Sequence, residues 1–160
     1  MQRIPAVVVM VSIIACVQQA PKVDLAQEEA AIRSLLDQST RGLTEHNWSR
    51  YSEFWKHAPD IEVMHPAAAE WIVGWDSVAT KYQRMIGDTA TNISVSNKRQ
   101  RIHLSPLGDM AWVTQEDVLR VGPTGKESEI VQWSTAVYEK RGDSWRLVHA
   151  HASLPARSNR

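Results

Sequence analysis

Two histidines near the C-terminus have the type and spacing that proton-transfer chemistry requires. Imidazole exchanges protons near neutral pH, so two rings on one face of a strand can act on a common ligand. His149 and His151 follow Trp145 and Leu147 at period 2, in a segment that Pro155 ends. This alternation predicts that the four side chains share one face, which runs from a packed core to a polar pocket.

Three roles fit His149 and His151. The rings could act as general acid and base, could bind a ligand through hydrogen bonds, or could form half-buried pocket walls without chemistry. Metal binding is disfavoured, because zinc needs three or four convergent ligands, no cysteine is close, and the nearest carboxylates are distant in the sequence. We therefore predict no metal and no cofactor.

Three further residues are candidates for catalysis. His65 lies where a short strand ends at Pro66, so it either reaches a ligand at a pocket mouth or belongs to a surface turn. Glu116 and Asp117 are adjacent, so only one carboxylate can point inward, where burial would raise its pKa and make it a base. Alternation does not distinguish the two, and either could be a solvated charge at a sheet edge. If His65 converges with the two C-terminal histidines, the three rings form one polar patch.

Large aromatic residues supply candidates for the pocket walls. The chain of 160 residues has seven tryptophans, and such rings tend to line cavities and interfaces as well as cores. The candidates for ligand binding are Trp71, Trp75, Tyr82, Trp112 and Trp133. Alternatively, these rings anchor the core and a dimer interface.

Capping signals and periodicity predict the elements that position these residues. Asp24 begins a capping box and an apolar stripe at helical spacing, which predicts a helix over residues 24–46. Asn47 caps a shorter helix that ends before Pro59, and a third helix follows Gly74. Apolar runs and period-2 alternation predict strands at 61–64, 70–73, 92–105, 110–121, 127–140 and 144–153. Helices followed by antiparallel strands predict an α+β fold, in which the sheet curls into a cone with an open end.

The order of these elements, together with three short motifs, resembles the NTF2-like superfamily. The motifs are His65-Pro66, Gly108-Asp109-Met110-Ala111-Trp112-Val113 and Trp145-Arg146-Leu147-Val148-His149-Ala150-His151. Residues 24–155 are most similar to its SnoaL-like, or ketosteroid-isomerase-homologue, branch, and the last motif also resembles the association domain of calmodulin-dependent kinases. The resemblance implies a cone in which a curved antiparallel sheet wraps around about three N-terminal helices.

The resemblance does not select one activity, because this fold hosts isomerases, dehydratases, cyclases, carriers and assembly domains. The isomerase roles cannot be transferred, since Tyr51, Tyr82 and Tyr138 lack recognisable partners. We predict a domain that binds a small hydrophobic or mixed-polarity molecule, with histidine-assisted proton transfer of an isomerase, dehydratase or hydrolase kind. The alternatives are a non-catalytic ligand carrier and a homodimeric assembly module of the bacterial envelope.

The composition of residues 1–20 predicts that the protein is exported. An apolar stretch too short to span a membrane leads to Ile13-Ile14-Ala15-Cys16, which resembles a bacterial lipobox. We expect Cys16 to be lipidated and to hold the protein at the periplasmic side of the cell envelope; the alternative is cleavage after Ala20. Residues 21–155 then form the domain and 156–160 a disordered tail. Basic and acidic residues both number 18, and a neutral chain is a poor ligand for nucleic acid, so the expected membrane contact is the lipid anchor alone.

Overall fold

The computed structural model describes residues 23–65 and 71–155. The expected export signal with its lipidated Cys16, and the expected tail at 156–160, lie outside the described residues and stay predictions. None of the helices in the described part of the chain has the length and apolar composition that a membrane span requires.

The three helices of the described chain begin where the capping signals predict. α1 (Leu25–Thr44) follows Asp24, whose carboxylate accepts hydrogen bonds from two backbone N–H groups of the first turn, each at 3.1 Å. α2 (Trp48–Ser52) follows Asn47, whose side chain accepts one such bond at 3.0 Å. α3 (Trp75–Gly87) follows a glycine and has no side-chain cap. The two side-chain caps satisfy N–H groups that a helix start leaves unpaired.

The strands of the described residues form one sheet, in the order β2-β1-β6-β5-β4-β3. Their bounds are β1 (Glu62–Met64), β2 (Ile72–Val73), β3 (Asn92–Leu104), β4 (Met110–Gly122), β5 (Ser128–Arg141) and β6 (Ser144–Ser153). Neighbouring strands are antiparallel except β1 and β6, which run in parallel. The four long strands are antiparallel as predicted, and the short β1 adds a parallel pairing at the edge of β6. The chain leaving α2 already runs in the direction of β6, because Trp55 forms a parallel bridge with Leu147.

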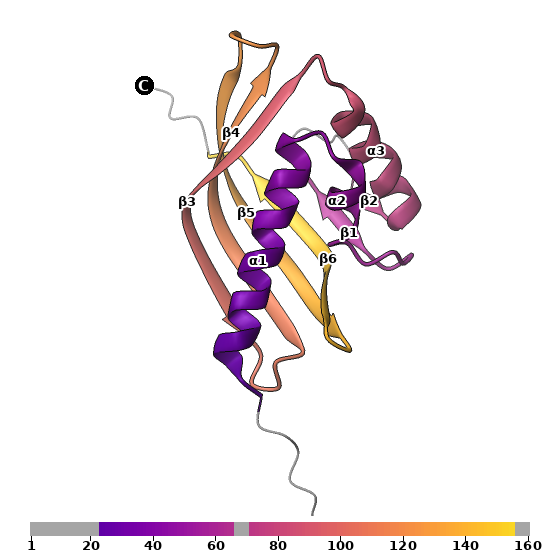
Figure 1. The fold of residues 1–160 in the computed structure, drawn as a ribbon, viewed down its shortest axis with the longest axis vertical. Coiled ribbons are helices and arrows are strands. Elements are labelled where there is room, and N and C mark those ends of the chain that lie inside the picture. The colour runs from indigo at the N-terminus through magenta and orange to yellow at the C-terminus, as the bar shows by residue number, and fades with distance from the viewer. Residues whose placement is uncertain (1–22, 66–70, 156–160) are drawn as a thin grey trace, which may run out of the picture.

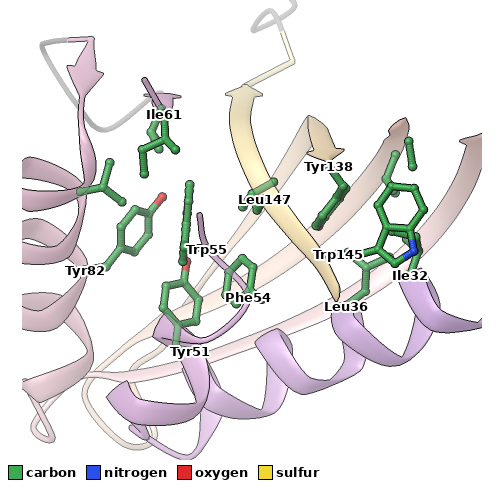
Figure 2. Packing of buried hydrophobic residues seen from close by; sticks show 14 of the residues in the cluster. Ile32, Leu36, Tyr51, Phe54, Trp55, Ile61, Tyr82, Tyr138, Trp145 and Leu147 are labelled. Carbon is green, nitrogen blue, oxygen red and sulfur yellow. The ribbon is translucent and has the colours of Figure 1, made fainter. Parts of the chain in front are cut away.

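The sheet curves around α1, and the face toward the helices, here called the inner face, carries the core (Figure 1). Trp55 is the largest fully buried side chain and packs against Phe54 and Tyr82 (Figure 2). Ile32 of α1 and Leu147 of β6 belong to the same cluster, so one core joins helices and sheet. The opposite side of the sheet, here called the outer face, carries no described helix (Figure 1).

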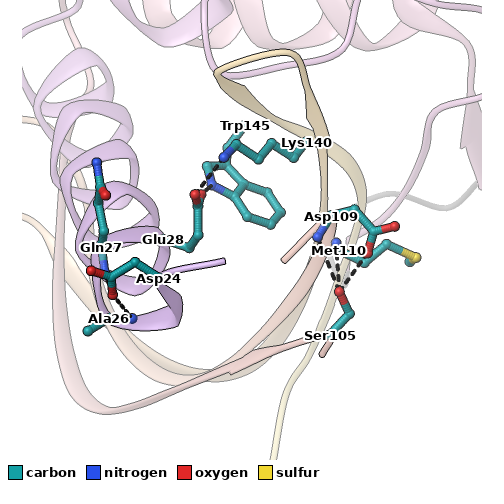
Figure 3. A network of polar contacts seen from close by, with 9 residues as sticks. All are labelled: Asp24, Ala26, Gln27, Glu28, Ser105, Asp109, Met110, Lys140 and Trp145. Carbon is teal, nitrogen blue, oxygen red and sulfur yellow. Dashed lines mark hydrogen bonds and ion pairs between the residues drawn. The ribbon is translucent and has the colours of Figure 1, made fainter. Parts of the chain in front are cut away.

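An ion pair fixes the start of α1 to the sheet. Glu28 accepts a hydrogen bond from Lys140 Nζ at 2.5 Å and one from Trp145 Nε1 at 2.9 Å (Figure 3). The Lys140 bond, helped by that of Trp145, lowers the pKa of Glu28 against the opposing effect of burial, so the carboxylate is ionised at neutral pH. These bonds hold the first turn of α1 against β5 and β6 and close this end of the cone.

Candidate functional site

A pocket of about 430 Å³ lies at the other end of the cone, where α1 ends and β3 begins. This volume lies within the range of about 300–1,000 Å³ that is typical of small-molecule sites. The inner faces of β3, β4 and β5 form one wall, and the helices form the other. The apolar side chains that line it are Leu43, Met85, Ile93, Val95, Leu119, Val121, Ile130 and Leu154.

His65 and Lys81 bring basic nitrogen atoms to this pocket. His65 follows β1 directly, and Lys81 lies on the face of α3 that borders the pocket. Burial of the imidazole, together with the nearby positive charge of Lys81, lowers the pKa of His65 below its usual value. At neutral pH the ring is therefore uncharged, with one nitrogen that donates a hydrogen bond and one that accepts.

Two tyrosines lie side by side in the pocket wall. The rings of Tyr51 and Tyr82 have centroids 5.3 Å apart and are tilted by 36° (Figure 2). Burial raises the pKa of Tyr82 to about 12 and, with the effect of that neighbour, raises the pKa of Tyr51 well above 10. Both phenols therefore keep their protons at physiological pH and can donate hydrogen bonds. Of the five residues predicted to bind a ligand, Tyr82 is the one that lines this pocket.

Asp117 is the inward-pointing member of the acidic pair. Its side chain is only 3% exposed, one inner-face position beyond the pocket-lining Leu119. The carboxylate accepts hydrogen bonds from Asn97 Nδ2, from Ser134 Oγ at 2.8 Å and from Gln115 Nε2 at 3.2 Å. Asp117 thus organises a polar layer beneath the pocket and does not itself line it.

The neighbouring Glu116 points to the outer face. Its carboxylate lies 3.7 Å from the Arg99 guanidinium, in an ion pair across β3 and β4. Both members of the acidic pair are therefore engaged with partners, and the structure places neither carboxylate in the pocket as a free base.

A β-bulge in β6 changes the position of the two C-terminal histidines. Tyr138 of β5 lies opposite Leu147, whereas the preceding Val137 lies opposite His149, so Val148 is an extra residue in β6. The bulge reverses the alternation for every residue that follows it.

The prediction that His149 and His151 share a face with Trp145 and Leu147 is therefore wrong. Trp145 and Leu147 are buried in the core, whereas both histidines lie on the outer face. His149 Nδ1 is 3.7 Å from the Glu62 carboxylate on β1, and His151 is exposed. These two rings do not meet His65, so the polar patch of three histidines does not form.

The four tryptophans predicted to line the pocket lie elsewhere. Trp112 and Trp133 occupy outer-face positions of β4 and β5 and are 45% and 53% exposed. Trp71 precedes β2 and is also exposed. Trp75, at the start of α3, stacks on His57 with centroids 3.8 Å apart. The expectation that these four rings line the pocket is therefore corrected. The alternation of β4 and β5 turns Trp112 and Trp133 to the outer face. Trp71 and Trp75 border surface grooves beside α3.

Several pocket residues were not among the predicted site residues. Lys81, Tyr51 and Gln132 bring an amine, a phenol and an amide to the pocket wall. One signal could have identified Lys81: it lies within the stripe of α3 that runs from Val78 to Met85, where a lysine interrupts apolar residues at helical spacing. Within residues 23–65 and 71–155 no group of three or more histidine, cysteine, aspartate or glutamate side chains could hold a metal ion.

The fold is similar to that of several solved structures. A candidate dehydratase of the NTF2-like family from Streptomyces avermitilis matches with a TM-score of 0.73 and 18% identity, over 82% of this chain and 99% of that chain. An NTF2-like superfamily protein from Salmonella enterica serovar Typhimurium matches with a TM-score of 0.73 and 18% identity, over 84% of this chain and 96% of that chain. A candidate scytalone dehydratase from Novosphingobium aromaticivorans matches with a TM-score of 0.67 and 16% identity, over 82% of this chain and 87% of that chain. These likenesses show the fold, and no curated protein matches the chain.

The curved sheet, the helices on its inner face and the pocket at the open end define an α+β cone of the NTF2-like class. The family model described as SnoaL-like domain matches residues 32–157, and the chain belongs to this family. The predicted cone and the predicted SnoaL-like branch are both confirmed.

Proposed function

We propose that this domain binds a small, largely apolar molecule in the pocket at the open end of the cone. The observation that carries the proposal is the pocket itself. Its walls are mainly aliphatic, and a few polar groups, among them His65, Lys81 and Gln132, lie around them. A mostly apolar cavity with a few polar groups that fix orientation is the usual form of a small-molecule site.

The proposed chemistry is proton transfer by His65. A neutral imidazole in a partly dry site can take a proton from a carbon next to a carbonyl group. In an isomerase the imidazolium returns the proton to another carbon, and in a dehydratase it protonates the hydroxyl group on the β-carbon, which leaves as water. The ammonium group of Lys81 would stabilise the negative charge that develops on the ligand oxygen. The dehydratase names of two structural neighbours support this class of reaction over hydrolysis.

Filling the pocket tests the proposal. We expect Leu119→Trp to weaken binding of naphthalene probes at least about tenfold, because an indole would occupy much of the space between β4 and the helices. The probes are 2-naphthoate and 2-naphthamide, followed by their fluorescence. The matched control is Thr114→Trp, on the same strand but on the outer face. Equal affinity in Leu119→Trp and the unchanged protein would contradict pocket binding.

We also propose that the outer face joins two copies of this chain. One row across this face runs His103, Trp112, Val137, His149, Glu62, and the next runs Arg101, Thr114, Thr135, His151, Met64. In these two rows Arg101 and His103 lie on β3 and the carboxylate of Glu62 lies on β1, with Trp112 and Val137 between them. The neighbouring row adds the Arg99–Glu116 ion pair and the exposed Trp133.

A second copy fits this pattern better than an unrelated partner. A two-fold axis along β5 sets the β3 edge of one copy against the β1 edge of the other, which pairs opposite charges around an apolar centre. Five strands about 4.8 Å apart, with 13 residues in β3 and β4, offer on the order of 800 Å² per copy, the area of a standard interface.

Trp133→Glu is expected to shift the protein from dimer to monomer in sedimentation, because a carboxylate cannot be buried unpaired at such an interface. Trp71→Glu introduces the same charge at an exposed tryptophan that borders the groove beside α3, and it should leave the mass unchanged. A monomer in the unchanged protein at high micromolar concentration would contradict the proposed dimer.

A further inference from the structure

Lys81 brings to the pocket a positive charge that pairs with no described carboxylate. Lys81 is partly buried at the pocket wall, yet within the described residues its amine takes part in no ion pair or side-chain hydrogen bond. Lysines that approach apolar surfaces normally keep the ammonium group in water or beside a carboxylate. Lys81 lies between this pocket and the groove beside α3, so its ammonium group is at the rim of the apolar cavity and can attract an anion.

The one carboxylate among the described pocket residues forms no ion pair with Lys81. Asp88, at the end of α3, accepts a hydrogen bond from Ala90 N at 3.2 Å and one from Thr91 Oγ1 at 2.8 Å. Both of its oxygens thus hold the turn that leads into β3. The two phenols in the wall stay protonated, as shown above, so they add no negative charge.

The remaining polar groups also favour an anion. His65 is close enough to Lys81 for that charge to lower the pKa of the ring, and the uncharged imidazole brings no negative charge that would oppose an anion. The buried side-chain amide of Gln132 adds a donor from β5. An oxygen anion gains from this donor and from the Lys81 ammonium group, whereas a cationic ligand would be repelled by that ammonium group.

We infer that the pocket selects a molecule with an apolar body and one carboxylate group, and that Lys81 is the residue that sets this preference. The inference rests on the proposed function and narrows its ligand class. The carboxylate lies at the α3 side of the pocket with Lys81 and His65. The apolar body lies against the aliphatic wall that includes Ile93, Leu119 and Ile130.

A matched pair of probes tests the inference. 2-Naphthoate carries a carboxylate, and 2-naphthamide has nearly the same shape without the charge. We expect the unchanged protein to bind 2-naphthoate about tenfold more tightly than the amide, since hydrogen bonds to a charged group are worth more than neutral ones. Lys81→Gln should remove this preference by weakening the binding of 2-naphthoate about tenfold.

Arg84→Gln is the control, because it removes one positive charge from the same helix at an exposed position that faces an outer groove and not the pocket. It should keep the tenfold preference, and Lys81→Arg should keep most of it. The comparison of acid and amide on the unchanged protein needs no variant, so it decides the carboxylate preference even if Lys81→Gln folds poorly, and Lys81→Arg then tests the role of the charge at this position.

The outcomes separate this inference from the proposed function. If both probes bind equally, and Leu119→Trp weakens both, the pocket binds small molecules but the carboxylate preference is wrong. If the preference for the acid persists in Lys81→Gln, another group sets it and the role of Lys81 is wrong. If neither probe binds at millimolar concentration, both the inference and the proposed function fail.

Discussion

Trp55→Ala is expected to lower the free energy of unfolding by about 3–5 kcal/mol, the range found when a buried tryptophan is truncated. Trp55 is 2% exposed, and its ring lies 5.4 Å from that of Phe54 and 5.8 Å from that of Tyr82. Its backbone also forms the bridge to Leu147 on β6. The truncation leaves a cavity between the helices and the sheet that these neighbours cannot fill. Urea unfolding at pH 7 measures the resulting loss in the free energy of unfolding.

Trp55→Phe provides the comparison. The indole Nε1–H is buried and makes no hydrogen bond of normal geometry within the described residues, so a phenyl ring at this position loses mainly packed volume. We expect this change to cost about 1–2 kcal/mol. A loss below about 1 kcal/mol in Trp55→Ala would contradict the central position of this ring in the core.

Gly42→Val is expected to destabilise the protein by about 3 kcal/mol, even though glycine is a poor helix former. Gly42 is buried in the last turns of α1, where a Cβ atom would lie 2.8 Å from Tyr51 N and 3.0 Å from Tyr51 Cα. Backbone atoms cannot swing aside as a flexible side chain can. The substitution must therefore push α2 away from α1, which also moves Tyr51 in the pocket wall.

Gly87→Ala is the matched control for this close approach. Gly87 is the last residue of α3, and a Cβ atom there would meet nothing within 4 Å. Thermal unfolding should show Gly87→Ala equal to or slightly more stable than the unchanged protein, because alanine loses less backbone entropy. An equally mild effect of Gly42→Val would show that α1 and α2 do not pack as closely as described.

Local signals in the sequence predict most of the fold. Asp24 and Asn47 cap helices because their side chains reach backbone N–H groups over one turn, which depends on neighbouring residues alone. The long strands carry period-2 patterns between turn residues, so their bounds are predicted to within a few residues. The order of these elements, together with the closing motif, is enough to indicate the SnoaL-like family.

The candidate site is less predictable, because it depends on strand register and tertiary position. A single extra residue, Val148, moves His149 and His151 to the outer face, and no residue type in that segment announces a bulge. The choice between Glu116 and Asp117 likewise depends on which face of β4 meets the helices. The position of His65 at a strand end predicts a site residue, whereas Lys81 becomes one only because α3 packs beside the cone.

The most direct test of pocket binding is a titration of the histidine Cε1–H proton resonances by NMR, with each naphthalene probe added in turn. His65 lines the pocket, whereas His149 and His151 lie on the outer face of the sheet. Variants with asparagine at each of these three positions assign the signals. We expect the His65 resonance to shift with the probe, and with 2-naphthoate also to titrate at higher pH, because a nearby anion favours the protonated ring. The resonances of His149 and His151 should stay in place. A shift of those two signals with an unchanged His65 would place the ligand on the outer face and contradict a binding site inside the cone.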